Sequence, residues 1–204
     1  MTKRFLKTAY GLETADQTRD YYQDWAASYD DEITENGYAT PTRCAEALAR
    51  HAPDFTKPLL DIGCGTGLSG IAFQKAGFTT LDGNDLSSDM IAQAKARGIY
   101  RTLGLADLHN PLDFKVGAYD YIAAVGVISV GHAPAHTITD MLDKLSPGGL
   151  FVFSLNDPTI EEGSFTATLD AVLADERADL CERHHGTHLP GFGMESSVIV
   201  LRKR

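Results

Sequence analysis

Four glycines lie within eight residues in the stretch LLDIGCGTGLSG, directly after a short apolar run. Glycines let a loop approach a bound molecule closely, because they carry no Cβ atom. Two patterns fit this stretch. Gly65, Gly67 and Gly70 have the spacing G-x-G-x-x-G, which cradles a dinucleotide diphosphate at a helix N-terminus. Gly63, Gly65 and Gly67 have a second spacing, in which the carboxylate of Asp61 precedes the loop.

The charge of Asp61 distinguishes the two ligands. At roughly 6 Å and an effective dielectric constant of about 20, this carboxylate would repel a phosphate charge by about 3 kcal/mol. A cofactor that carries an ammonium and a sulfonium would be attracted instead. A dinucleotide fingerprint also starts at the strand end, where Gly63 stands, and from there Leu68 occupies the third glycine position. We therefore expect a cationic cofactor rather than a nicotinamide dinucleotide.

Histidines and a cysteine suggest two further kinds of chemistry. His132, in the segment SVGHAP, is a candidate for a substrate-facing group or general base, with a structural histidine as the alternative. Cys181, His184, His185 and His188 have the composition of a zinc site. Neighbouring side chains of a strand point to opposite faces, so we expect no metal site there.

These residues must be positioned by alternating strands and helices. Strands are predicted over residues 59–62, 79–85, 99–103, 119–125 and 150–155. Helices are predicted over residues 16–33, 40–52, 68–76, 87–98, 136–145 and around 165–173. The C-terminal runs 179–185 and 196–201 leave no room for a helix between them, which predicts an antiparallel hairpin around LPGFG.

This order of elements predicts an α/β fold with a Rossmann-like, doubly wound, seven-stranded and mainly parallel sheet. Such sheets bind ligands at the carboxyl ends of their strands. We expect one domain over residues 1–204, with an N-terminal helical lid over 1–57 and a cofactor-binding core over 58–204. The lid carries Tyr22, Trp25 and Tyr29 at helical spacing on one apolar face.

Composition narrows the range of partners. The 204 residues include 18 Lys and Arg against 28 Asp and Glu, a net charge of −10, which argues against nucleic acid as a partner. Three widely spaced cysteines do not make a disulfide framework. No apolar run has the length of a signal peptide or a membrane span. We expect a cytoplasmic protein that acts away from membranes, and the oligomeric state stays open.

Four segments together resemble the class I S-adenosylmethionine-dependent methyltransferases. LLDIGCGTG resembles motif I of that family, LDGNDLSSDMIAQA its second-strand motif, ADLHNPL the stretch after the third strand, and LSPGGLFVF the entry into the fifth. The lead-in YYQDWAASYDDEI and the segment GVISVGHAP further resemble the methyltransferase-like group named for the Williams–Beuren chromosomal region.

The resemblance implies a role for each matching residue. The glycine loop with Cys64 would give room to the methionine part of the cofactor, and Asp61 would support its amino group. Around the adenosine, Asp85 would bind the ribose hydroxyls, Leu86 and Met90 would pack on the adenine, and Asp107 with the Leu108 backbone would bind its edge. Val125, Gly126 and Tyr29 would lie beside the methionine moiety, Tyr29 through attraction between its ring and the sulfonium.

The function that this resemblance implies is methyl transfer to a small-molecule acceptor by in-line displacement, with S-adenosylhomocysteine as the second product. The cofactor supplies the reactive methyl group, so the protein needs no catalytic triad. Two alternatives are an NAD(P)-dependent oxidoreductase and a non-catalytic, cofactor-sensing protein on the same fold. The identity of the acceptor and its reacting atom stay open.

Overall fold

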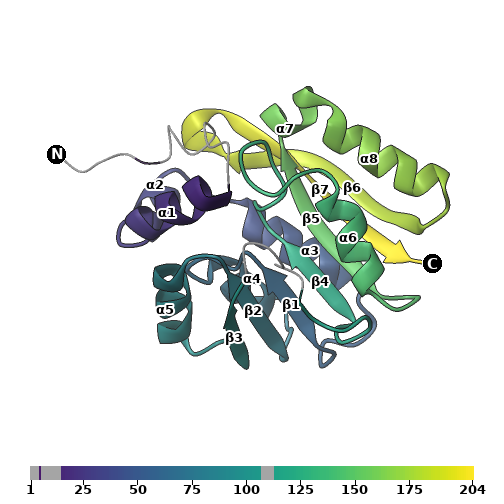
Figure 1. Cartoon of the computed structure of the whole chain (residues 1–204), viewed down its shortest axis with the longest axis horizontal. Helices are drawn as coiled ribbons and strands as arrows, with labels where there is room; N and C mark the ends of the chain where they lie inside the picture. Colours follow the sequence, from purple (N-terminus) through teal and green to yellow (C-terminus); the bar gives the residue numbers. More distant parts are fainter. Residues whose placement is uncertain (1–4, 6–14, 107–112) are drawn as a thin grey trace.

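The structure is a computed structural model that describes residue 5 and residues 15–106 and 113–204. The strands in this part of the chain are β1 (Leu59–Ile62), β2 (Leu81–Asp85), β3 (Thr102–Leu105), β4 (Tyr121–Ala124), β5 (Leu150–Asn156), β6 (Ala178–Leu189) and β7 (Met194–Lys203). They form one sheet in the order β3-β2-β1-β4-β5-β7-β6 (Figure 1). β1 to β5 pair in parallel, and β7 pairs antiparallel with β5 and β6. The predicted fold class is confirmed.

Helices cover both faces of the sheet. They are α1 (Ala15–Trp25), α2 (Tyr29–Glu35), α3 (Thr40–His51), α4 (Leu68–Lys75), α5 (Ser88–Arg97), α6 (Thr137–Lys144), α7 (Asp157–Glu162), α8 (Ser164–Ala174) and the short 3-10 helix η2 (Pro190–Phe192). α3 and α4 pack Leu48 and Phe73 on one face, and α6 and α8 pack Met141 and Leu169 on the other. None of the helices within the described ranges combines the length and apolar character that a membrane crossing needs.

Local signals explain why several predicted bounds hold. Pro41 stands in the first turn of α3, where its fixed backbone angle favours a helix. The Ser87 side chain caps α5 by accepting a hydrogen bond from the Met90 backbone nitrogen at 3.3 Å. Gly98 ends α5 in the left-handed conformation, with φ of 66°.

Two predicted elements need correction. The single helix expected over 16–33 is two helices, because the chain turns after Trp25 and the Ser28 backbone nitrogen donates to the Trp25 carbonyl at 3.0 Å. Across this turn the Trp25 indole donates to the Glu32 carboxylate at 3.0 Å, which holds α1 and α2 together. The third strand lies at Thr102–Leu105 rather than 99–103, because Tyr100 turns toward the glycine loop instead. α7 was not predicted.

α1 and α2 lie to one side of the sheet (Figure 1). Thr18 on α1 donates a hydrogen bond to the Gly131 carbonyl at 3.1 Å, in the loop that follows β4. That loop leaves the carboxyl end of a central strand, so the contact places α1 over the ligand-binding edge of the sheet. Whether α1 and α2 act as a lid stays a prediction.

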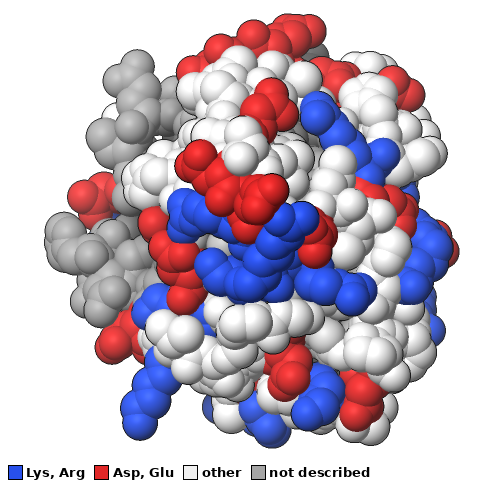
Figure 2. All heavy atoms as spheres, turned by 90° about the vertical axis from the view of Figure 1, so that its right-hand side faces the viewer, with Lys and Arg blue, Asp and Glu red and all other residues white. Residues whose placement is uncertain are grey.

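The side of the molecule opposite α1 and α2, which is on the right in Figure 1, carries a cluster of Lys and Arg side chains interspersed with carboxylates (Figure 2). Several cations around the β6–β7 hairpin are paired, such as Arg50 with Glu182 at 2.6 Å and Arg204 with Asp179 at 2.5 Å. Exposed pairs of this kind contribute little to stability, but they reduce the field that the cluster presents to an anion.

Candidate active site

A cavity of about 450 Å³, the larger cavity, opens at the carboxyl ends of β1, β2 and β4. This is the edge at which doubly wound sheets bind ligands. The predicted site residues that line it are Tyr29, Gly63, Gly65, Asp85, Leu86, Met90, Gly126 and His132. The structure therefore brings together residues that the sequence separates by more than 100 positions.

The other predicted residues have different places. Asp61, Cys64 and Val125 are buried and do not belong to the described lining. Burial raises the pKa of the Cys64 thiol well above its usual value, so it stays protonated. Gly67 forms the N-terminal cap of α4. Asp107 and Leu108 lie outside the described residues.

The glycine loop needs its glycines for two different reasons. Gly63 and Gly65 both have positive φ angles, 62° and 53°, which side chains rarely adopt. A Cβ at Gly63 would also lie 2.5 Å from the Cγ2 atom of Val127, so the loop and the segment after β4 touch there. A Cβ at Gly65 would meet nothing within 4 Å, and its backbone borders the larger cavity. The space beside Gly65 is thus open to a ligand, while its amide nitrogen donates to Asp85 at 2.9 Å.

Gly70 serves packing rather than ligand binding. A Cβ at this position would lie 2.4 Å from the hydroxyl oxygen of Tyr100 and 2.9 Å from the Cδ1 atom of Ile99. Gly70 is buried on α4, outside the described lining of the larger cavity. The third glycine of the apparent dinucleotide fingerprint therefore makes room for an aromatic ring.

Asp61 lies fully buried beneath the glycine loop. Its Oδ2 atom accepts hydrogen bonds from the Ser69 and Tyr100 hydroxyls, both at 2.6 Å. Its Oδ1 atom is buried and has no partner within the described part of the chain. Burial raises the pKa of this carboxyl to about 6, although the two hydrogen bonds oppose the rise. A buried, incompletely satisfied carboxylate favours a nearby cation.

Asp85, at the end of β2, holds the turn between β2 and the glycine loop. Its Oδ2 atom accepts from the Gly65 backbone nitrogen and its Oδ1 atom from the Ser87 backbone nitrogen, each at 2.9 Å. Burial raises its pKa, while these amides lower it. Each carboxylate oxygen keeps a second lone pair, so Asp85 can also accept from a ligand hydroxyl in the larger cavity.

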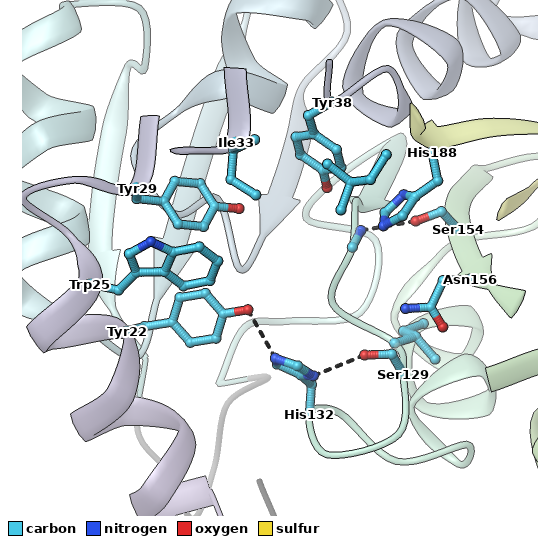
Figure 3. A pocket seen from close by; sticks show the side chains of 13 residues that line it. Tyr22, Trp25, Tyr29, Ile33, Tyr38, Ser129, His132, Ser154, Asn156 and His188 are labelled. Atoms are coloured by element: carbon cyan, nitrogen blue, oxygen red, sulfur yellow. Dashed lines mark hydrogen bonds between the residues drawn. The ribbon is translucent and has the colours of Figure 1, made fainter. Parts of the chain in front are cut away.

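A second, smaller cavity of about 40 Å³ adjoins the larger one (Figure 3). One wall is aromatic: Tyr22, Trp25 and Tyr29 come from α1 and α2, with the Trp25 and Tyr29 ring centroids 4.7 Å apart. The opposite wall is polar, and its labelled side chains are Ser129, His132, Ser154, Asn156 and His188. Tyr22, Tyr29, Gly126 and His132 line both cavities.

His132 connects the two walls of the smaller cavity. Its Nε2 atom lies 2.9 Å from the Tyr22 hydroxyl, and its Nδ1 atom lies 3.0 Å from the Ser129 hydroxyl (Figure 3). Burial lowers the pKa of the imidazole below its usual value. The ring is therefore neutral near pH 7 and able to accept a proton.

Sequence reasoning missed Ser154 and Asn156 as residues of the smaller cavity. Ser154 accepts a hydrogen bond from the Gly126 backbone nitrogen at 2.9 Å, and Asn156 caps α7. A Cβ at Gly126 would lie 2.5 Å from the Tyr38 hydroxyl oxygen, so Tyr38 closes this side. The Asn-x-x-Thr spacing after β5, which allows a capping hydrogen bond, is the signal that could have found Asn156.

The histidine and cysteine cluster is dispersed along β6. His188 turns inward, where the Thr40 hydroxyl oxygen lies 2.7 Å from the Nδ1 atom of the ring. Burial lowers the pKa of His188 to about 4. His185 faces Asp157 and Glu195 instead, at 3.5 and 3.2 Å. No set of three potential metal ligands comes together within residues 15–106 and 113–204.

The fold and the two cavities define the class as a Rossmann-like α/β protein with its cavities at the carboxyl ends of the parallel strands. The methyltransferase domain family matches residues 37–192. Human "Methyltransferase-like protein 27" is 34% identical over 148 residues, which are 71% of this chain and 60% of that protein. The 18S rRNA (guanine(1575)-N(7))-methyltransferase of Saccharomyces cerevisiae is 34% identical over 70 residues, 34% of this chain and 26% of that enzyme. The chain thus spans less than two thirds of each curated relative.

Among solved structures, the S-adenosylmethionine-dependent methyltransferase from Thiobacillus denitrificans, in complex with S-adenosyl-L-homocysteine, superposes with a TM-score of 0.62. It shares 15% identity and covers 89% of this chain and 98% of its own, which shows a common fold. The chain belongs to the methyltransferase domain family and, with it, to the class I S-adenosylmethionine-dependent methyltransferase superfamily. The cofactor of that superfamily is S-adenosylmethionine. The human relative also agrees with the narrower Williams–Beuren resemblance.

Proposed function

We propose that this chain transfers a methyl group from S-adenosylmethionine to a small-molecule acceptor by in-line displacement. The larger cavity would hold the cofactor and the smaller cavity the reacting end of the acceptor. The observation that carries this proposal is the shared wall of Tyr22, Tyr29, Gly126 and His132. A cofactor in the larger cavity and an acceptor in the smaller one would both contact these four residues. Their reacting atoms would then lie close together, as a displacement requires.

The residues of the larger cavity fit the charge of the cofactor. The unpartnered Oδ1 atom of Asp61 lies under the glycine loop, and the proposed occupant of that loop carries an ammonium group. No Lys or Arg side chain other than Arg19 lines the cavity among the described residues, which disfavours a diphosphate. The half-buried ring of Tyr29 can stabilise a sulfonium through its π face.

The adenosine would lie toward β2 and α5. In this arrangement Asp85 accepts from the ribose hydroxyls, and Leu86 and Met90 pack against the adenine. We propose that Asp107 and Leu108 contact the adenine edge. Val125 is proposed to lie beside the methionine moiety. The cofactor supplies an activated methyl group when bound, so these residues bind and orient it and exclude water.

A small acceptor fits the smaller cavity better than a nucleic acid does. The cavity admits only a few non-hydrogen atoms, because one water needs roughly 10–15 Å³ of such volume. Its described lining includes no Lys or Arg, and the chain carries a net charge of −10. The basic cluster of Figure 2 lies on the side away from α1 and α2. The yeast relative named for rRNA aligns over only 70 residues.

Calorimetric titration separates the proposal from its alternatives. We expect S-adenosylhomocysteine to bind and NAD(H) and NADP(H) not to; binding of a nicotinamide dinucleotide alone would support the oxidoreductase. Asp85→Asn should lower the affinity for S-adenosylhomocysteine about 10- to 100-fold, because a hydrogen bond to a charged group contributes about 1.5–3 kcal/mol. Asp120→Asn, an exposed carboxylate paired with Lys57 at 3.8 Å, is the matched control.

Turnover requires a second experiment. We expect labelled methyl groups to move from S-adenosylmethionine to a member of a metabolite library, detected by mass spectrometry of the products. Cofactor binding without any product across the library would favour the non-catalytic, cofactor-sensing protein. The role of residues 1–57 as a lid within one domain is tested in the same assay by deleting residues 1–35, which removes α1 and α2 and should abolish methyl transfer.

A further inference from the structure

The polar wall of the smaller cavity carries hydrogen-bond donors that the described part of the chain does not use. They come from Ser154 and Asn156 on β5 and from His188 on β6 (Figure 3). These residues are 3%, 8% and 4% exposed, so each is more than nine-tenths buried. A buried donor without an acceptor is costly, so donors that face a cavity together indicate a ligand there.

The hydrogen-bond chain behind His188 determines which ring nitrogen carries the proton. Arg43 can only donate, and its Nη1 atom donates to the hydroxyl oxygen of the buried Ser196 at 3.0 Å. The Ser196 proton therefore goes to the Thr40 hydroxyl oxygen at 3.3 Å, and Thr40 donates to His188 Nδ1 at 2.7 Å. The neutral ring then carries its proton on Nε2, which has no partner within the described part of the chain.

Two side chains of β5 add donors to the one from His188. The Asn156 Oδ1 atom caps α7 by accepting from the Thr159 backbone nitrogen at 3.1 Å, which leaves the Nδ2 amide to donate. The Ser154 oxygen accepts from the Gly126 backbone nitrogen at 2.9 Å, so its hydroxyl proton is also available. Neither of these donors has an acceptor among the residues that the structure describes. All of these donors belong to side chains that line one small cavity.

The charges around these donors favour an anion. No Asp or Glu belongs to the described lining of the smaller cavity. After burial, the guanidinium of Arg43 is the largest cause that lowers the pKa of His188, and Asp157 opposes it less strongly. Arg43 thus produces a positive potential at the ring, and such a potential also stabilises a bound anion. The donors therefore suit a negatively charged oxygen better than a neutral carbonyl.

The volume of the smaller cavity limits the anion to a small group. At about 40 Å³ it admits about three water-sized atoms, because one water needs roughly 10–15 Å³. A carboxylate, with one carbon and two oxygens, has this size, whereas a phosphate group is larger. A carboxylic acid has a pKa of about 4, so it arrives ionised at neutral pH.

We propose that Ser154, Asn156 and His188 bind the carboxylate of the methyl acceptor, and that the acceptor is a short carboxylic acid that is converted to its methyl ester. This inference rests on the proposed function. One carboxylate oxygen accepts hydrogen bonds from the donors, and a lone pair of the other oxygen forms the bond to the methyl carbon. The carbon–sulfur bond breaks as this bond forms, and its electron pair goes to sulfur. No proton is transferred, so His132 need not act as a base.

Binding is tested without turnover by NMR of protein labelled with nitrogen-15 histidine at pH 7.5. We expect His188 as the Nε2–H tautomer, both in the protein alone and with S-adenosylhomocysteine. Sodium acetate added to the S-adenosylhomocysteine complex should shift the His188 Nε2 resonance saturably, and sodium chloride at the same concentration should not. An unprotonated Nε2, an absent acetate shift or an equal shift with chloride would overturn the inference.

Asn156→Asp keeps a capping side chain on α7 and replaces a donor by a negative charge, so it should abolish the acetate shift. Asn156→Ser also keeps a cap but lacks the Nδ2 donor, and it should lower the affinity for acetate about 10- to 100-fold. Gln74→Glu adds the same charge at an exposed position of α4 and is the matched control, which should bind acetate like the wild type. Retained binding of S-adenosylhomocysteine shows that each variant is folded. Unchanged acetate binding in both Asn156 variants would contradict the site.

The acceptor class is tested with straight-chain acids from acetate to hexanoate and with the amide, alcohol and amine of each chain length, each with labelled S-adenosylmethionine. We expect methyl esters only, and Asn156→Asp should lower kcat/KM at least about 10-fold with an unchanged affinity for S-adenosylhomocysteine. Methylation of the alcohols or amines, or the absence of any ester, would overturn the inference.

The methionine part of the cofactor also carries a carboxylate, and the same measurements distinguish the two sources. If S-adenosylhomocysteine alone shifts His188 as acetate does, and Asn156→Asp lowers the affinity for S-adenosylhomocysteine, the donors bind the cofactor. The inference then fails and the proposed function stands. If S-adenosylhomocysteine does not bind at all, the proposed function itself fails.

Discussion

Replacing the buried carboxylate of Asp61 by an amide should make the ligand-free protein more stable. In Asp61→Asn the side-chain oxygen can accept the same hydrogen bonds from Ser69 and Tyr100, and the amide nitrogen takes the place of the unpartnered Oδ1 atom. The substitution thus removes a buried charge and keeps its two good contacts. Wild type and variant then differ in that charge and in the amide hydrogens that replace it.

The raised pKa of Asp61 sets the size of the effect. A folded-state value of about 6 against an ordinary value of 3.8 is a difference of about 2 units. At about 1.36 kcal/mol per unit, ionised Asp61 lowers the free energy of unfolding by about 3 kcal/mol at neutral pH. Because the folded state binds the extra proton, the stability of the wild type rises as the pH falls from about 6 to about 4. The advantage of the variant is therefore present at pH 7.5 and is lost across that window.

Urea unfolding at several pH values measures this directly. We expect Asp61→Asn to exceed the wild type by about 1–3 kcal/mol at pH 7.5, and the gap to close near pH 4. Asp120→Asn should show no gap that changes across this range. S-adenosylhomocysteine should raise the melting temperature of the wild type more than that of Asp61→Asn, because its ammonium compensates the carboxylate. A variant that is less stable than the wild type at pH 7.5, or a gap independent of pH, would refute this account.

Three further outcomes are expected. Tyr100→Phe removes a hydrogen bond that lowers the pKa of Asp61, so the carboxyl should titrate above 6 in carbon-13 NMR spectra; an unchanged midpoint would show that the bond is absent. Gly63→Ala should lower the free energy of unfolding, measured in urea, by about 1 kcal/mol more than Gly98→Ala does. Both glycines have positive φ, but a Cβ would overlap Val127 at Gly63 and would meet no atom within 4 Å at Gly98. Equal losses would contradict this overlap. His188 has its pKa lowered to about 4 by burial, so the unfolded chain binds its proton first as the pH falls. Relative to His188→Gln, the wild type should lose about 3 kcal/mol between pH 6.5 and pH 4, and parallel unfolding curves would argue against a buried neutral ring.

The alternation of strands and helices could be predicted because its signals are local. The buried run Leu59–Ile62, the cap at Ser87 and the stop at Gly98 each act over a few residues. The glycine loop could be placed for the same reason, since it follows the first strand directly. Its contact with the segment after β4 could not, because that contact depends on the pairing of strands far apart in sequence.

The break between α1 and α2 has no glycine or proline signal, and the helix-start signal of Ser28 followed by Asp30 and Asp31 was overlooked. Residues 26–28 read Ala-Ala-Ser and contain neither Gly nor Pro, so helical periodicity continues through them. The turn is held by the bond from the Trp25 indole to Glu32, seven residues further along the chain. Periodicity likewise finds the face that carries Tyr22, but it does not distinguish a ring in a core from a ring at a cavity. His132 was expected near substrate, whereas its tyrosine partner was visible only in three dimensions.

The ring that fills the space above Gly70 links two positions that lie 30 residues apart. A descendant of this chain that gains a side chain at position 70 must at the same time shrink the residue at position 100, so the two sites should change as a pair during evolution. Genome searches that use the G-x-G-x-x-G string alone will retrieve such chains as dinucleotide enzymes, although their last glycine accommodates a tyrosine.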